Sequence, residues 1–389
     1  MSTQQTHPIK VMIAGFFSLV LTLGVARFSY TPLLPVMLDE TFLTNATGGW
    51  LATINYMGYM SGALIAASIS DLMLKDRLYR IGLIVAIATT IGMALAENYI
   101  LWAVMRFFAG LSSAAGLLLG SGLILNWLMK HGHRAELGIH FGGLGLGIAV
   151  SAAVTMLMVG CFNWQEQWKI FAAVGVILFI PAWFWLPKPD SASLGVHAKK
   201  MEDKPPIKSW MRLLFAAYFC AGFGYVISAT FLVTIIESQP ALEGKGNLVW
   251  LITGLAATPA CIIWDRISRK IGELQALMIA YGVNIIGIII PVFDSSLAGV
   301  MLSGFLFGAT FIGIVSLMLT MVGKFFPTKP AKPMGKLTLS YGAAQIIAPA
   351  MSGMMAQATG NYNTPLILAA MIMLLGIGLL WRLKVSQKY

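Results

Sequence analysis

Residues 11–34 read VMIAGFFSLVLTLGVARFSYTPLL, an apolar stretch whose one charged residue is Arg27. A helix of about 20 apolar residues, rising about 1.5 Å per residue, crosses the hydrocarbon core of a bilayer. The stretch is longer than the apolar region of a secretory signal and lacks a small-residue cleavage site. It therefore predicts a first transmembrane helix and no cleavable leader.

The whole chain shares this apolar character. Of its 389 residues, 58% are hydrophobic and 11% are charged, against about 25% charged in a typical soluble domain. This composition excludes a soluble enzyme, a disordered chain and a small domain held by disulfides. No metal-ligand cluster, Ser-His-Asp arrangement or phosphate loop is evident, so we expect no enzyme, no metal and no cofactor.

Long apolar runs predict an all-α membrane protein with twelve transmembrane helices. The polar segment Lys188–Ser209 divides them six and six. We expect two pseudo-symmetric six-helix bundles, at 1–187 and 210–389, with a cytoplasmic linker at 188–209. The expected helices lie at about 11–34, 48–70, 80–96, 99–128, 138–160, 168–187, 210–236, 248–264, 273–293, 297–322, 336–357 and 363–382.

The positions of Lys and Arg predict the orientation, because cytoplasmic loops are enriched in these residues. With both termini in the cytoplasm, only Lys169 and Lys245 of the 26 basic residues fall in outer loops. Arg27 and Arg106 lie inside spans, and the others lie in cytoplasmic segments. The net charge of +11 thus reflects orientation in a lipid membrane, and we expect no nucleic-acid partner.

Two basic segments at matching places indicate an internal duplication. The first reads Asp71-Leu-Met-Leu-Lys-Asp76-Arg77-Leu-Tyr-Arg80, and the second reads Asp265-Arg266-Ile-Ser-Arg269-Lys270. Each follows the second expected helix of its half, and we expect both to be tight cytoplasmic turns. Two related halves are typical of secondary transporters, whose substrate site lies between them near the bilayer midplane.

These features resemble the major facilitator superfamily over nearly the whole chain. The segment at 265–270 resembles its loop motif, and Arg106-Phe-Phe-Ala-Gly110 resembles its helix 4 motif. Three stretches are similar to the YbfB/YjiJ-type branch: GVARFSYTPLLP at 24–35, GFGYVISATF at 222–231 and LSYGAAQIIAP at 339–349. The resemblance implies a monomeric transporter of the bacterial inner membrane that rocks two halves around a central site. It also implies a gating motif made of Asp71, Asp76, Arg77, Arg80, Asp265, Arg266 and Arg269.

Two arginines are the deep charges of the chain. Arg27 and Arg106 each lie about seven residues, or roughly 10 Å, from the outer end of their expected helix. All 15 acidic residues fall in loops or at helix ends. Because Arg suits bidentate binding of carboxylate, phosphate or sulfonate, the pair predicts a small anionic substrate. The competing interpretation of either arginine is structural, as a residue that bonds backbone carbonyls between helices.

Polar side chains at compatible positions are further candidates for substrate contact, since a buried hydroxyl or amide needs a partner. The alternative for each is a hydrogen bond between helices. The candidates are Tyr30, Asn55, Tyr56, Tyr59, Tyr218, Tyr225, Thr230, Tyr341 and Gln345. Trp50 and Trp250 begin the second and eighth expected helices, where an interfacial belt predicts tryptophan.

Proton coupling has one candidate pair. His140 lies four residues after Glu136 near the cytoplasmic start of the fifth expected helix, a spacing that permits a hydrogen bond. The alternative is a solvated surface pair.

The sequence thus favours a secondary transporter of a small organic anion by alternating access, with proton coupling open. One alternative is a proton-driven exporter of drugs or other apolar or cationic compounds, which the 23 Met and 21 Phe would suit. Such a pump usually needs a deep carboxylate. The other alternative is a membrane receptor or assembly partner without solute flux.

Overall fold

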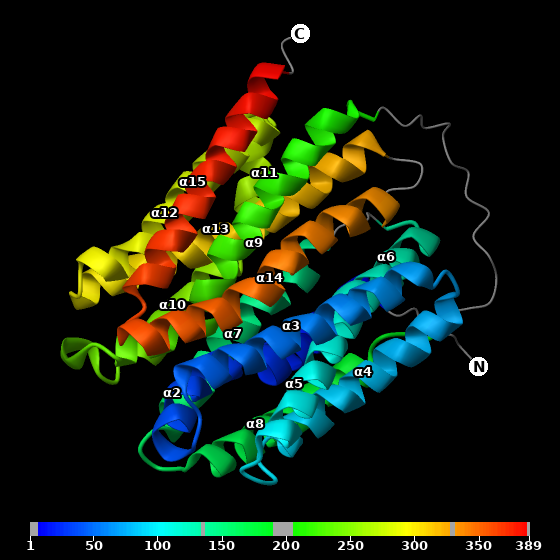
Figure 1. Ribbon diagram of the computed structural model, residues 1–389. Helices are drawn as coiled ribbons and strands as arrows, with labels where there is room; N and C mark the ends of the chain where they lie inside the picture. Colours follow the sequence, from blue (N-terminus) through cyan, green and yellow to red (C-terminus); the bar gives the residue numbers. More distant parts are fainter. Residues whose placement is uncertain (1–6, 134–136, 190–204, 327–330, 387–389) are drawn as a thin grey trace.

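Helices follow one another without a strand in the computed structural model, which describes residues 7–133, 137–189, 205–326 and 331–386. The first group of helices precedes the expected linker (Figure 1). It consists of α1 (Pro8–Leu19), η1 (Val20–Phe28), α2 (Tyr30–Glu40), α3 (Asn45–Ser68), α4 (Leu72–Gly92), α5 (Tyr99–Ala114), η2 (Ala115–Leu119), α6 (Gly120–Lys130), α7 (Gly138–Met158) and α8 (Trp164–Phe184).

The second group follows the linker. It consists of α9 (Lys208–Glu237), η3 (Pro240–Leu242), α10 (Gly246–Ala257), α11 (Ala260–Ile271), α12 (Glu273–Phe293), α13 (Leu297–Phe325), α14 (Ala331–Thr359) and α15 (Asn363–Ser386).

Some of these helices join into longer rods. Pro8–Glu40 and Tyr99–Lys130 are each one continuous span, whereas α10 and α11 meet at a bend of 48°. Counted this way, the described residues form twelve rods, in the order that the sequence predicts.

By length and apolar composition alone, eight of the helices can cross a membrane, and the bent pair makes a ninth. The rods that fall short are α3, α4 and α14. In α3 and α14, glycine, serine and threonine lower the hydropathy, and these two helices pack on each other. Small and polar residues are typical of contacts between membrane helices.

The basic segments expected to be turns are helical, which corrects the prediction. Asp71 accepts hydrogen bonds from the backbone of Met73 and Leu74 and so caps α4. The helix therefore begins at Leu72 and carries Asp76, Arg77 and Arg80 within it. Likewise, Asp265, Arg266 and Arg269 lie in α11, which ends only at Ile271. Hydropathy missed both helix ends because their residues are charged.

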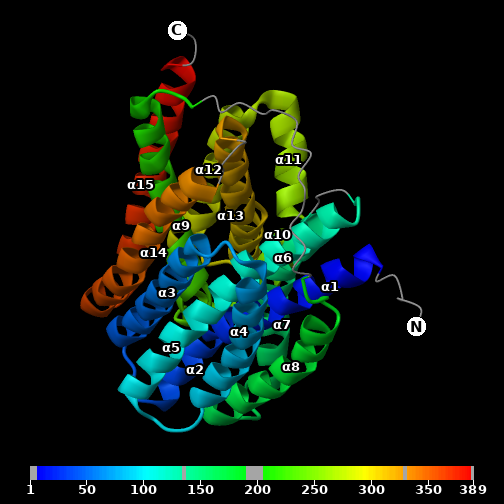
Figure 2. The ribbon, with the colours of Figure 1, turned by 90° about the vertical axis from the view of Figure 1, so that its right-hand side faces the viewer.

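The two sides of the bundle differ in how the groups meet. On the terminal side, where α1 begins and α15 ends, α9 and α15 stand upright in Figure 2 while α1 and α6 run out to the right. On the far side, the groups are joined by hydrogen bonds. Thr31 Oγ1 donates to the Ala229 carbonyl at 2.6 Å, and the Tyr362 hydroxyl donates to Asn45 Oδ1 at 3.0 Å. Among the described residues, every bond between the groups lies nearer the far side.

Thr53 makes the deepest of these connections. Its hydroxyl donates to the Ile346 carbonyl at 2.8 Å and accepts from the Ala350 N–H at 3.1 Å. In a regular helix those two backbone groups would bond each other. Pro349, inside α14, cannot donate to the ladder and disturbs it at this level. A side chain of α3 thus completes the backbone bonding of α14.

Candidate functional site

The first span changes its helical geometry where Arg27 lies. Val20–Phe28 is π-helical, a form that is rare and mostly found in short pieces near functional sites. Pro32 follows closely and has no N–H to donate. The change from η1 to α2 therefore leaves backbone carbonyls open to other donors.

Arg106 of α5 takes two of these carbonyls. Its Nη1 donates to the oxygens of Ala26 at 3.3 Å and Arg27 at 3.4 Å. Its guanidinium carbon lies 4.3 Å from the ring centroid of Tyr30. The structure thus brings the two deep arginines to one segment, but it gives Arg106 the backbone-bonding geometry.

The Arg27 guanidinium is enclosed by aromatic rings instead. Its Cζ lies 4.5 Å from the ring centroid of Tyr56 and 4.8 Å from that of Tyr59, both on α3. Tyr225 of α9 interacts with it electrostatically from the other group. The residue is 6% exposed, and its Nε has no hydrogen-bond partner. Within the described ranges, no carboxylate forms an ion pair with it.

Tyrosine hydroxyls near Arg27 differ from those of the other buried tyrosines. No hydrogen bond joins the hydroxyls of Tyr59, Tyr218 or Tyr341 to another described residue, and none of these oxygens is fully enclosed. Tyr56 lies in hydrogen-bonding range of both Arg27 and Tyr225. By contrast, the hydroxyls of Tyr30, Tyr79 and Tyr281 donate to the carbonyls of Gly48, Ala182 and Ala217.

The remaining polar candidates are spread around this centre. Asn55 Nδ2 donates to the Arg106 carbonyl at 2.8 Å, so Asn55 and Tyr30 both tie helices together. Gln345 is buried with an unpartnered Oε1, and Thr230 is 3% exposed. The side chains that do meet at Arg27 come from the first, second, seventh and eleventh rods.

Residues of the expected gating motif make contacts within their own group. Arg80 Nε lies 3.0 Å from Asp76 Oδ2, and both side chains are buried. The Arg80 Nη atoms donate to the carbonyls of Trp183 and Leu186, which fastens α4 to the end of α8. Asp265 and Arg269 form an exposed pair at 2.8 Å. Arg77 and Arg266 are exposed.

His140 is fully buried on α7. Its Nε2 lies 2.8 Å from Ser121 Oγ, and Ser121 in turn donates to the Leu117 carbonyl. Glu136, its expected partner, lies outside the described residues.

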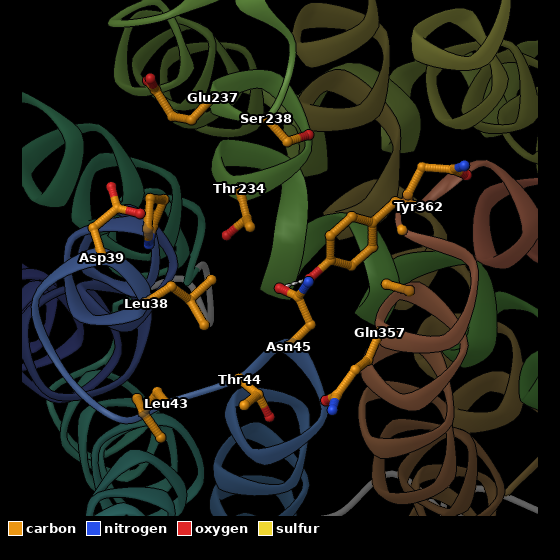
Figure 3. Close-up of a pocket in the computed structure, with 14 residues that line it drawn as sticks. Leu38, Asp39, Leu43, Thr44, Asn45, Thr234, Glu237, Ser238, Gln357 and Tyr362 are labelled. Atoms are coloured by element: carbon orange, nitrogen blue, oxygen red, sulfur yellow. Dashed lines mark hydrogen bonds between the residues drawn. The ribbon is translucent and has the colours of Figure 1, made fainter.

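A pocket of about 500 Å³ opens on the far side between the two groups (Figure 3). Its lining includes the carboxylates of Asp39 and Glu237, the Thr234 hydroxyl and the bonded pair Asn45 and Tyr362. Glu237 accepts from the backbone N–H groups of Gly244 and Gly246 at 2.7 Å each. Burial raises the pKa of Tyr362, so its phenol stays a neutral donor to Asn45. With two acidic residues and no cation, this pocket does not suit an anion.

Trp250 was misjudged from the sequence. It is fully buried, its Nε1 donates to Ser151 Oγ at 3.1 Å, and its ring centroid lies 6.2 Å from that of Phe28. It therefore joins α10 to α7 and does not lie at a lipid interface. Trp50, at 45% exposure, does fit an exposed belt. A pattern of hydropathy does not distinguish these two environments.

Comparisons with known proteins agree with this architecture. The sequence model of a family described as "Uncharacterised MFS-type transporter YbfB" matches residues 19–381. An uncharacterised MFS-type transporter of Bacillus subtilis, YceJ, is 25% identical over 279 residues, 68% of each chain. The probable sulfoacetate transporter SauU of Cupriavidus necator is 21% identical over 97% of this chain and 94% of its own.

Solved structures show the same fold. A crystal structure of the nucleoside transporter NupG superposes with a TM-score of 0.74 at 15% identity, covering 98% of this chain and 99% of that one. A mutant of NupG gives a TM-score of 0.78 at 14% identity. At this level of identity the likeness concerns the fold alone.

Proposed function

This chain belongs to the YbfB-type family of major facilitator transporters, and on that premise we propose that it carries a small organic anion, bound through Arg27. The family and the curated relatives are transporters and not enzymes. The observation that carries the proposal is a buried guanidinium with no carboxylate or carbonyl partner among the described residues.

The three arginines buried among the described residues differ in the partners of their guanidinium groups. Arg80 has Asp76 and two carbonyls, and Arg106 has two carbonyls. Arg27 has aromatic faces and the neutral hydroxyl of Tyr56, and the faces attract a cation by about 0.5–2 kcal/mol. Removing a charge from water costs several kcal/mol unless a partner offsets it. An anionic group 4 Å away would supply about 4 kcal/mol at an effective dielectric constant of 20.

Arg106 acts here as a positioning residue. Its bonds to the Ala26 and Arg27 carbonyls hold the π-helical segment that presents Arg27. Its own charge adds to the positive potential without being free for bidentate contact. One arginine, and not two, then determines the charge that the site accepts.

The relatives and the chemistry of the site favour an anion over the exporter alternative. SauU, which spans nearly the whole chain, is a probable sulfoacetate transporter, and sulfoacetate is an organic anion. A binder of cationic compounds would need a carboxylate near Arg27, and the described residues supply none. Arg106, but not Arg27, is tied to backbone carbonyls.

Transport would proceed by alternating access in the bacterial inner membrane, with the terminal side in the cytoplasm. The positive-inside distribution of Lys and Arg supports this orientation. The hydrogen bonds of the far side hold the two groups, at 1–187 and 210–389, in a state closed to the outside. Opening that side would break the bonds of Thr31, Asn45 and Thr53 to the second group.

Coupling to protons would involve His140, a fully buried imidazole near the start of α7. Its imidazole lies between α7 and α6, so protonation would alter the Ser121 contact. Replacement of His140 by Gln should then abolish any dependence of uptake on a proton gradient.

Flux into proteoliposomes tests the proposal. Sulfoacetate, a dianion at neutral pH, is a useful reference anion, because a relative of similar length is its probable transporter. The parent protein should transport a labelled monovalent organic anion, with sulfoacetate as a weaker competitor, and Arg27→Gln should transport neither. Arg212→Gln, at an exposed site outside the expected gating motif, is the matched control and should transport like the parent. Equal flux through Arg27→Gln would refute the proposal.

A further inference from the structure

The second group presents stacked aromatic rings toward Arg27. Tyr218, Tyr225, Phe307, Phe311 and Tyr341, from α9, α13 and α14, form what we call the ring wall. Tyr225 lies 5.1 Å from Phe311 and 5.8 Å from Tyr341, and Tyr218 lies 4.5 Å from Tyr341, between ring centroids. The planes within each of these pairs differ by 29–30°. These rings therefore lie nearly parallel to one another.

The ring wall lies near Arg27 across the boundary between the groups. Tyr56 and Tyr59 of α3 place their ring centroids within 5 Å of the guanidinium carbon. Tyr56 in turn lies in hydrogen-bonding range of Tyr225 of the ring wall, and Tyr225 and Tyr341 both interact electrostatically with Arg27. One positive group thus lies among tyrosines from both halves of the chain, with its ring faces supplied by α3.

The unbonded hydroxyls add polar groups to this apolar surface. Tyr59, Tyr218 and Tyr341 have no hydrogen-bond partner among the described residues, although each is at most 8% exposed. Because none of these oxygens is fully enclosed, a ligand can bond them in place of solvent. A ligand that fits offers a flat apolar body and one anionic group, whose oxygen atoms can accept from these hydroxyls.

We propose that the transported anion is aromatic, a monovalent arene carboxylate or sulfonate whose ring packs against the ring wall while its charged group pairs with Arg27. The inference rests on the proposed function and narrows its substrate class. A second anionic group has no free cation to meet, because Arg106 is engaged by the Ala26 and Arg27 carbonyls. Dianions should therefore bind less well than monoanions.

Two matched anions separate aromaticity from size and charge. Benzoate and cyclohexanecarboxylate both carry one carboxylate on a six-membered ring, but only benzoate offers a π face. Calorimetric titration of the purified full-length protein should give benzoate an affinity about fivefold higher, as expected for one to two stacking contacts. The dianion terephthalate and the neutral benzamide should bind more weakly than benzoate.

A pair of variants assigns the preference to the ring wall. Tyr341→Phe keeps the ring and should retain the ratio of benzoate to cyclohexanecarboxylate affinity. Tyr341→Leu removes the ring and should bring that ratio close to one. Arg27→Gln, by contrast, should lose binding of both anions. The ratio of benzoate to cyclohexanecarboxylate affinity is measured on the parent protein itself, so the test remains valid if a variant does not fold.

Failure of this inference is distinguishable from failure of the proposed function. If the parent binds cyclohexanecarboxylate as tightly as benzoate, and Arg27→Gln binds neither, the aromatic preference is wrong and the anion site stands. If the parent and Arg27→Gln bind these anions equally, or neither binds any of them, both proposals fall.

Discussion

Arg27 and Arg106 show how backbone geometry decides the role of a charged residue. The two lie at one level of the bundle, yet only Arg106 reaches the carbonyls that the π-helical segment leaves open. Arg27 belongs to that segment and points to the rings of α3. In the proposed function, one arginine therefore stabilises the site, and the other offers its charge to a ligand.

Replacing Arg106 by Gln should weaken both stability and binding. The variant loses charge-assisted bonds to two carbonyls, so we expect the free energy of unfolding to fall by about 1–3 kcal/mol. Anion affinity should fall by a smaller factor than in Arg27→Gln, because Arg27 is displaced and not removed. Thermal unfolding in detergent and anion titration measure the two effects. An Arg106→Gln protein as stable as the exposed-site variant Arg212→Gln would contradict this role.

The sequence indicated which residues matter at this scale but not how they divide the work. A deep arginine is visible in any hydropathy profile, and so are the tyrosines near it. The π-helical turn, the approach of Arg106 to Ala26, and the meeting of Tyr56 with Tyr225 depend on contacts between distant parts of the chain. No spacing in the sequence encodes them.

Glycines set the distance between helices at the element scale. A Cβ on Gly24 of η1 would lie 2.6 Å from the Gly147 Cα of α7, whereas a Cβ on Gly122 of α6 would meet nothing within 4 Å. Gly143 of α7 is equally close to the first span. A Cβ on Gly143 would lie 2.5 Å from the Phe16 carbonyl oxygen.

Alanine substitutions at Gly24 and Gly122 should have opposite effects. Gly24→Ala should destabilise the protein by about 1–3 kcal/mol through overpacking. Gly122→Ala should raise stability by up to about 1 kcal/mol, because alanine favours the helix interior. The midpoint of thermal unfolding measures both changes. Equal midpoints for the two variants would show that η1 and α7 do not pack as described.

Thr53 tests a contact between elements of different groups. Thr53→Val removes the hydroxyl between the Ile346 carbonyl and the Ala350 N–H. We expect a loss of about 1–3 kcal/mol, since two buried backbone groups lose a partner. Thr53→Ser keeps the hydroxyl and should be much closer to the parent. If Val and Ser behave alike in thermal unfolding, the hydroxyl contributes nothing.

Hydropathy predicted the number and order of the rods well and their ends poorly. The first span reaches Glu40, and α4 begins at Leu72, because capping groups and charged helical turns extend beyond the apolar core. The break between α10 and α11 lies at Pro259, within the short eighth helix expected at about 248–264. Membrane burial selects apolar residues, whereas helix ends follow hydrogen bonding.

At the scale of the whole molecule, the bonds of the far side and the divergence of the terminal side fit one state of the proposed alternating-access cycle. In that proposal, the far-side bonds must break for the other state to form. The acidic pocket of the far side lies at this boundary (Figure 3).

Cys161 offers a natural test of the orientation. It is exposed in the turn after α7 on the far side, whereas Cys220 is buried and Cys261 is half-buried. A membrane-impermeant maleimide should label Cys161 in intact bacterial cells, and Cys161→Ser should remove the label. Labelling that appears only after the membrane is permeabilised would reverse the assigned orientation.

Thermal unfolding of the parent and Arg27→Gln, each with and without a monovalent organic anion, tests the central claim most directly. At a concentration of 100 times Kd, ligand binding stabilises the native state by about 2.7 kcal/mol. We predict that the anion raises the midpoint of the parent and leaves Arg27→Gln unchanged. The ligand-free variant should be at least as stable as the parent, because it lacks an uncompensated buried charge. An equal anion-induced rise in both proteins would contradict the account.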